Sequence, residues 1–163
     1  MRALLIFLSL ALGSWSLAAE IVPPDPWEVI HAAREFGTAE VGRDTLSEPR
    51  IVGAFAEHED DPEIAYEINF YGCELARNCK TILFRASLHH GDWEKKPPHL
   101  DLFDAWNRRK LIGRAFWSLD GRAVLEHPVA MSAGLPKETL VATFLAWKTA
   151  LQDYGEFLDF PGS

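Results

Sequence analysis

The sequence has few cysteines, no long apolar run and comparatively few basic residues. Only 2 of its 163 residues are cysteine, and a chain of this length needs neither a metal nor a dense disulfide framework to fold. The apolar stretch from Ala3 to Leu12 is about ten residues long, short of the roughly 20 that a membrane-spanning helix needs. The sequence contains no set of acid, base and nucleophile at a recognisable catalytic spacing. These absences argue against a membrane anchor and against an enzyme defined by a motif.

The N-terminal segment has the order of an export signal. Arg2 precedes the apolar stretch, and small residues follow it up to Ala19, which is typical of a secretory signal peptide. With Ser16 and Ala18 as the small residues of the cleavage site, we predict a signal peptide over residues 1–18. The mature protein is therefore expected in the periplasm or secreted, without membrane attachment after cleavage.

The predicted mature chain is acidic. Its 145 residues carry 15 basic and 24 acidic side chains, a net charge of −9 with histidines neutral. Such a surface repels phosphate backbones and anionic lipid headgroups. Nucleic acid is therefore a poor candidate for a partner.

The pattern after the signal predicts one α+β domain over residues 26–158, between a proline-rich lead-in at 19–25 and a tail at 159–163. Alternation and helical periodicity predict the order α-β-β-β-β-α-β-β-α, which favours a curved antiparallel sheet packed with helices. The dipeptide Asp120-Gly121 predicts a hairpin with a two-residue turn. The expected elements are helices near 26–36, 99–110 and from 135 onward, and strands near 38–43, 50–57, 63–73, 79–88, 112–119 and 122–130.

Apolar residues at fixed spacings predict the core. Even-numbered residues of the third and fourth strands are expected to face it, as is one stripe of the last helix. Shorter stripes are expected to begin at Trp27 and at Leu100 in the other two helices. The last-helix stripe consists of Leu140, Phe144, Trp147, Leu151 and Tyr154.

Cys73 and Cys79 are odd-numbered and lie at the inner ends of the third and fourth strands. Strand parity therefore predicts that both lie on the face opposite the core, side by side across one turn. In an oxidising compartment such a pair forms a structural disulfide, worth about 2 kcal/mol for so short a loop. The alternative is a redox-active pair, but the spacing is Cys-x5-Cys and no helix is predicted to begin at either residue.

Metal ligands of the right chemical type gather in one polar stretch, where His89, His90 and His99 accompany Asp92 and Asp101. Imidazoles and carboxylates are ligands for zinc or copper. No established ligand spacing is matched, so we interpret the stretch as a solvated loop leading into a helix, and we predict no cofactor.

Ser132 lies in the sequence Ala-Met-Ser-Ala-Gly, which is similar to a nucleophile elbow but lacks its first glycine. No parallel sheet is predicted to support such an elbow. We therefore interpret residues 132–134 as the connection into the last helix, and we name no catalytic residue.

One family likeness covers about residues 26–158. The run YEINFYGCELARNCKTILFRA at 66–86, the pair Trp106-Asn107 with Arg108, and Gly113-Arg-Ala-Phe resemble the YbjN-like domain family, whose members are labelled bacterial sensory transduction regulators. The resemblance implies a fold similar to that of type III secretion chaperones, often paired as a homodimer. It implies no enzymatic role and supplies no catalytic residue.

The function expected from the sequence is that of a noncatalytic, exported binding or regulatory module that contacts a protein or peptide through a sheet face or edge. The motive is the second hairpin, where Phe116 and Leu125 are expected on one face and Trp117 and Val124 on the other, so that a second apolar face is free for a subunit or partner. The alternative is a small metal- or redox-dependent enzyme that uses the 89–101 loop or the cysteine pair.

Overall fold

The computed structural model describes residues 20–23, 25–55, 64–88 and 98–158. It is a mixed α+β structure in which a six-stranded antiparallel sheet, in the order β2-β3-β4-β5-β7-β6, is not closed into a barrel. The predicted fold class and order of elements are confirmed. The sheet consists of β2 (Gly37–Arg43), β3 (Pro49–Phe55), β4 (Ile64–Tyr71), β5 (Thr81–Leu88), β6 (Arg114–Trp117) and β7 (Ala123–Ala130).

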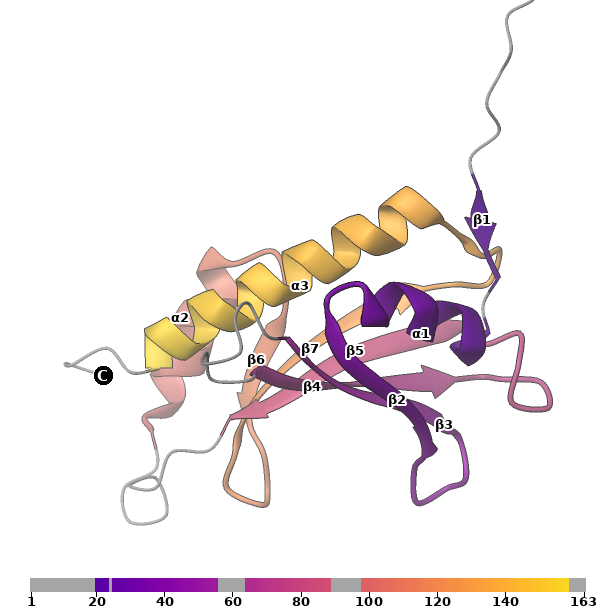
Figure 1. Ribbon diagram of the computed structural model, residues 1–163. Coiled ribbons are helices and arrows are strands. Elements are labelled where there is room, and N and C mark those ends of the chain that lie inside the picture. Colours follow the sequence, from indigo (N-terminus) through magenta and orange to yellow (C-terminus); the bar gives the residue numbers. More distant parts are fainter. Residues whose placement is uncertain (1–19, 24, 56–63, 89–97, 159–163) are drawn as a thin grey trace, which may run out of the picture.

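Helices α1 (Pro26–Arg34) and α3 (Lys137–Leu158) lie over one face of the sheet, and α2 (Leu100–Arg109) packs beside β6 (Figure 1). Helix α1 begins where the sequence predicts, because the Asp25 carboxylate accepts a hydrogen bond of 3.0 Å from the Trp27 backbone N–H, the usual arrangement of an N-cap. Within the described ranges, no helix is long and apolar enough to cross a bilayer.

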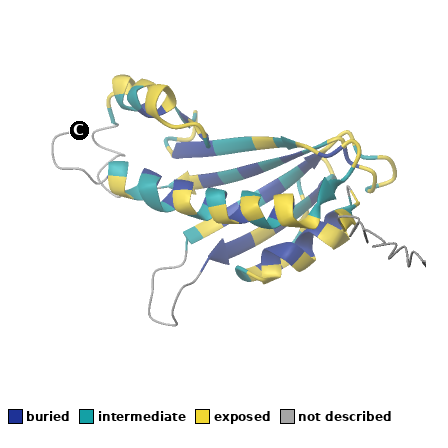
Figure 2. Cartoon of the chain, turned by 90° about the horizontal axis from the view of Figure 1, so that it is seen from above, coloured by how far each residue is buried: buried dark blue, intermediate teal, exposed yellow. Residues whose placement is uncertain are grey.

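The core lies between the helices and one face of the sheet. Figure 2 shows the strands striped between buried and less buried residues, as expected when one face is covered. The predicted stripe of α3 and the even-numbered residues of β4 and β5 are confirmed as core positions. The buried residues of the three elements include Tyr66, Ile68, Phe70, Ile82, Phe84, Ala86, Leu140, Phe144, Trp147, Leu151 and Tyr154.

The predicted stripes of α1 and α2 are wrong at their first residues, since Trp27 is 56% and Leu100 is 66% exposed. In α1 the buried stripe begins one residue earlier, at Pro26, and includes Val29 and Ile30. In α2 the predicted stripe advances by three residues each time, which turns it about 60° around the helix at each step. Leu100 therefore lies well away from the buried Trp106.

The turn between β6 and β7 differs from the prediction. Its closing pair is Ser118 and Arg122, where the Ser118 N–H donates to the Arg122 carbonyl over 2.9 Å, so that the loop has three residues and not two. Gly121 takes a φ of +77°, as the last residue of a three-residue hairpin loop commonly does.

A short pair of strands was not predicted. β1 (Ile21–Val22) pairs with β8 (Leu135–Pro136) in antiparallel fashion. Leu135-Pro136 was expected to open the last helix, but α3 begins two residues later than predicted, at Lys137. The N-terminal lead-in is thereby held against the start of α3.

Candidate functional site

The loop from Gly72 to Lys80 connects β4 and β5 and contains both cysteines. Their sulfurs are at disulfide distance, 2.17 Å apart. The predicted placement on the face opposite the core is wrong, because Cys79 is fully buried in the core and Cys73 packs against it. The strands end at Tyr71 and begin at Thr81, so strand parity does not extend to the cysteines.

The cysteine loop is a compact turn that contacts the start of α1. Leu75, Ala76 and Asn78 all have positive φ angles, a conformation that non-glycine residues adopt mainly in tight turns. Arg77 Nε lies 3.5 Å from Asp25 Oδ2, the same carboxylate group that caps α1. The loop therefore links the β4–β5 hairpin to the start of α1 through an ion pair. Neither cysteine lies at a helix N-terminus, the position that lowers a thiol pKa.

The predicted metal ligands are divided between two parts of the chain. His89, His90 and Asp92 lie outside the described residues. His99 is the N-cap of α2, and its Nδ1 accepts a hydrogen bond of 3.4 Å from the Asp101 N–H. In the part of the chain that the structure describes, no three His, Cys, Asp or Glu side chains converge as metal ligands do. The His99 imidazole therefore has a local structural role, and metal binding by the loop stays untested.

Ser132 is exposed in the turn between β7 and β8. The Gly134 N–H donates to the Met131 carbonyl over 2.8 Å to close this turn. Residues 132–134 thus form a connection leading toward α3, as predicted.

The face of the sheet opposite the helices, here called the open face, carries a row of charged residues. Glu40, Val52, Glu67, Arg85, Glu126 and Arg114 are successive register partners across all six strands. Arg85 lies 3.6 Å from Glu67 and 3.4 Å from Glu126, and Arg50 lies 3.4 Å from Glu67. The last four residues of this charged row, Glu67, Arg85, Glu126 and Arg114, alternate in sign, whereas the uncharged Val52 separates Glu40 from Glu67.

The apolar residues of the second hairpin are arranged differently from the prediction. Phe116 pairs with Val124, so these two share the open face, whereas Leu125 is in the core and Trp117 lies against Phe103 on the helix side. The predicted register of the hairpin was wrong by one residue, because the loop has three residues and not two. A shift of one residue moves every side chain of a strand to the opposite face of the sheet.

Burial shifts the pKa of several groups on or near the sheet. It raises the pKa of the Tyr71 hydroxyl on the open face, and the Glu126 carboxylate acts in the same direction. It raises the pKa of Tyr66 in the core to about 12 and lowers the pKa of His127. These side chains therefore remain neutral near pH 7.

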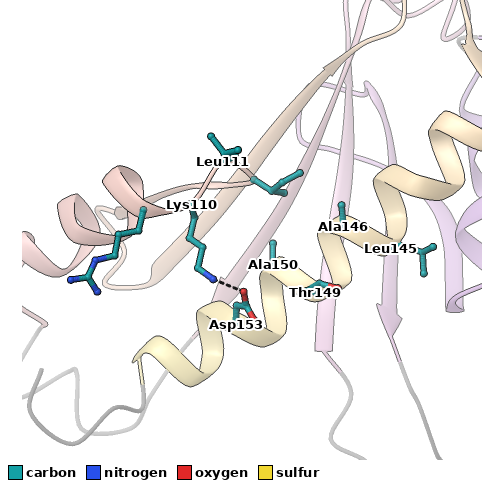
Figure 3. Close-up of a pocket in the computed structure, with 9 residues that line it drawn as sticks. Lys110, Leu111, Leu145, Ala146, Thr149, Ala150 and Asp153 are labelled. Atoms are coloured by element: carbon teal, nitrogen blue, oxygen red, sulfur yellow. Dashed lines mark hydrogen bonds and ion pairs between the residues drawn. The ribbon is translucent and has the colours of Figure 1, made fainter.

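A groove lies on the helix side, between α3 and the segment after α2 (Figure 3). Its volume is about 490 Å³, and Ile112, Ala146 and Ala150 are among the residues that line it. Leu111 is fully exposed and Leu145 is 52% exposed. Exposed leucines also occur elsewhere on the chain, but these two adjoin a groove, and contiguous apolar surface is what marks interaction sites.

Charged side chains also line the groove. Lys110 Nζ lies 2.5 Å from Asp153 Oδ2 and 5.4 Å from the centroid of the Trp106 ring. Arg109 also lines the groove, and it has no ion-pair partner within residues 20–23, 25–55, 64–88 and 98–158. The groove therefore combines an apolar lining with a positive charge that is unpaired within the described residues, in a protein whose net charge is −8.

Sequence reasoning missed the structural role of Trp106 and Asn107. Trp106 Nε1 donates to the Gly113 carbonyl over 3.0 Å. Asn107 Nδ2 donates to the Ala115 carbonyl over 2.9 Å, and the Ala115 N–H donates to Asn107 Oδ1 over 2.8 Å. The Asn107 amide thus pairs with the edge strand β6 as a neighbouring strand would. The signal in the sequence was the Trp-Asn pair itself, followed by Gly113-Arg-Ala-Phe.

The family model YbjN, described as "Putative bacterial sensory transduction regulator", matches residues 64–160, from β4 past the end of α3. Because the match spans more than half of the chain, the protein belongs to the YbjN family. No curated protein and no solved structure matches the chain.

Proposed function

We propose that the protein is a noncatalytic, exported regulatory module that binds a peptide segment of a partner protein in the periplasm. The family description supports a regulatory role. The export signal predicted over residues 1–18 supports the compartment, as does a cysteine pair at disulfide distance, since disulfides persist in oxidising compartments.

The observation that carries the binding role is the groove beside α3. Its exposed leucines, Leu111 and Leu145, offer apolar surface that is not covered within the described chain. Burying one leucine-sized side chain contributes about 1.5 to 3 kcal/mol. One or two such contacts, after the costs of association, suit the weak and reversible binding of a regulator.

The charge at the groove specifies the peptide. The Arg109 guanidinium lies beside the apolar lining without an ion-pair partner in the part of the chain that the structure describes. A guanidinium recognises a carboxylate through paired hydrogen bonds. Asp153 is already paired with Lys110. We therefore propose a peptide with an apolar side chain next to an aspartate or glutamate.

A panel of synthetic peptides tests this proposal by fluorescence anisotropy. Peptides with a leucine or phenylalanine beside an acidic residue are expected to bind, and the same peptides with lysine in place of the acid are expected to bind at least tenfold more weakly. Two variants, Leu145→Asp and Arg109→Glu, are expected to lose binding. Leu119→Asp is the control, because Leu119 is fully exposed in the β6–β7 loop and does not line the groove.

The proposal fails if no acidic peptide binds at millimolar concentration. It also fails if Leu119→Asp weakens binding as much as Leu145→Asp. The variants should keep the far-ultraviolet circular dichroism spectrum of the wild type, because the substituted leucines are exposed.

A further inference from the structure

One edge of the sheet presents backbone groups to the outside. β2 is the end strand of the sheet and pairs only with β3. The Asp44 N–H donates to the Glu48 carbonyl over 2.9 Å, and in an antiparallel pair the residues that bond the neighbouring strand alternate with residues that do not. Even-numbered residues of β2 therefore bond β3, whereas the N–H and C=O groups of Val41 and Arg43 point away from the sheet.

Two further contacts agree with this orientation. Pro49, which has no N–H to donate, is the register partner of Arg43. The outward carbonyl of Ala39 accepts a hydrogen bond of 3.1 Å from Arg34 Nε, a side chain of α1. No residue that the structure describes bonds the outward backbone groups of Val41. The free stretch of the edge therefore begins at Val41.

The two edges of the sheet differ in this respect. At the β6 edge, the Asn107 amide takes both the N–H and the C=O of Ala115. At the β2 edge, Arg34 has only donors, so it satisfies the Ala39 carbonyl and no N–H. Unpaired backbone groups on an edge strand are a template for another strand. β2 is therefore the edge at which an extended segment of another protein continues the sheet most readily.

A pocket lies beside this free stretch, on the helix side of the sheet. Its volume is about 220 Å³, and Pro26, Val41 and Pro49 are among the residues that line it, together with the exposed Trp27. Side chains of directly opposite residues in an antiparallel pair lie on the same face. Because Val41 packs against the core, the side chain opposite Val41 in an added strand falls on the helix side, next to the pocket.

The next position of the added strand meets an acidic side chain on the open face. Glu40 is exposed and has no ion-pair partner within the described ranges. A lysine or arginine opposite Glu40 forms a favourable cross-strand pair. Since antiparallel strands run in opposite directions, the residue opposite Glu40 follows the residue opposite Val41 in the sequence of the added strand.

We propose that β2 binds an extended segment of a partner protein as an added antiparallel strand, in which an apolar residue opposite Val41 is followed by a lysine or arginine opposite Glu40. Antiparallel pairing matches the neighbouring strands and is slightly more stable per residue than parallel pairing. This segment is basic, whereas the peptide proposed for the groove is acidic, and β2 does not line the groove. The proposal is therefore independent of the peptide-binding function.

The order of the two side chains in a synthetic peptide tests the direction of the added strand. The probe is a fluorescein-labelled peptide of threonines with a central phenylalanine followed by a lysine, and its binding to the mature chain is measured by fluorescence anisotropy. The reversed order places the lysine opposite Gly42 and is expected to bind about two- to fivefold more weakly. Equal affinities would contradict the proposed register.

Methylation of the peptide backbone tests the strand pairing itself. In the proposed arrangement the phenylalanine N–H donates to the Val41 carbonyl, whereas the lysine N–H points away from β2. N-methylation of the phenylalanine is expected to weaken binding at least tenfold. N-methylation of the lysine is the matched control and leaves the dissociation constant within about twofold. Equal losses from the two methylations would overturn the proposal.

Variants of the protein locate the site. Trp27→Ala is expected to weaken binding about tenfold and Glu40→Lys about fivefold. Glu138→Lys, the same charge change on α3, is the control for charge, and Leu145→Asp is the control for the groove; both leave the binding unchanged. Circular dichroism spectra of Trp27→Ala and Glu40→Lys should match that of the wild type, because both side chains are exposed.

Three further results would overturn the proposal. The first is the absence of binding at millimolar peptide. The second is a loss of binding in Leu145→Asp, which would place the peptide in the groove. The third is a wild-type dimer in sedimentation equilibrium that the peptide dissociates, since a second copy of the chain and not a partner segment would then occupy β2.

Discussion

The two hydrogen bonds between Asn107 and β6 are expected to contribute measurably to the free energy of unfolding. Asn107→Ala removes two hydrogen bonds to Ala115, of 2.9 and 2.8 Å, and exposes one residue of an edge strand. A hydrogen bond of this kind contributes about 0.5 to 1.5 kcal/mol net, so the free energy of unfolding is expected to fall by about 1 to 3 kcal/mol. For a domain of this size the melting temperature falls by roughly 3 to 10 °C.

Urea denaturation followed by tryptophan fluorescence measures this loss. The midpoint is expected to fall with the slope unchanged, since the surface exposed on unfolding stays the same. Arg108→Ala is the matched control, because Arg108 is the exposed neighbour in the same helix turn and alanine does not lower helix propensity. If the urea midpoint of Asn107→Ala equals that of Arg108→Ala, the Asn107 amide does not stabilise β6 by pairing with its backbone.

Three further predictions concern the sheet and the cysteine loop. Gly53→Ala is expected to destabilise the protein by about 1 to 3 kcal/mol in urea melts, because a Cβ there lies 2.7 Å from the Tyr66 ring and 2.8 Å from a backbone carbonyl; an unchanged midpoint would contradict this packing. Burial raises the pKa of Tyr66 to about 12 and also raises the pKa of Tyr154, so above pH 10 the unfolded chain binds fewer protons and each tyrosine lowers stability by about 1.4 kcal/mol per pH unit up to pH 12. Tyr66→Phe should make that fall about half as steep, and an equally steep fall would refute the assignment. Mass spectrometry of the exported protein should find Ala19 at the N-terminus and no alkylatable thiol before reduction at Cys73 or Cys79, whereas two free thiols would rule out the disulfide.

The sequence predicted the sheet and the long helix because their signals are periodic and strong. Alternation in β4 and β5 and the stripe of α3 each depend on many residues, so one exception does not change the result. The prediction of which side chains of β6 and β7 share a face was wrong, because a single turn sets the register between these two strands. Asp120-Gly121 fits a two-residue turn, but the Ser118–Arg122 pair closes a three-residue loop. The register between the strands therefore differs by one residue from the predicted one, which exchanges the two faces of one strand relative to the other.

Candidate sites were harder to predict than elements because they depend on contacts between distant segments. The groove joins α3 with residues 109–112, and no local pattern shows that these segments meet. The open face was predictable only in part, since its charged residues belong to six strands whose order cannot be read from one sequence. The cysteines were placed on the wrong face because the alternation was extended beyond the ends of the strands.

The central claim is that a peptide segment of a periplasmic partner occupies the groove. Site-specific photocrosslinking in intact cells tests it, with the photoreactive residue at position 145 and, as a control, at position 119. The account predicts a crosslinked partner segment that contains an apolar residue beside an acidic one, captured from position 145 only and lost when Arg109→Glu is added. Capture of the same proteins from both positions, or a partner segment without an acidic residue, would contradict the account.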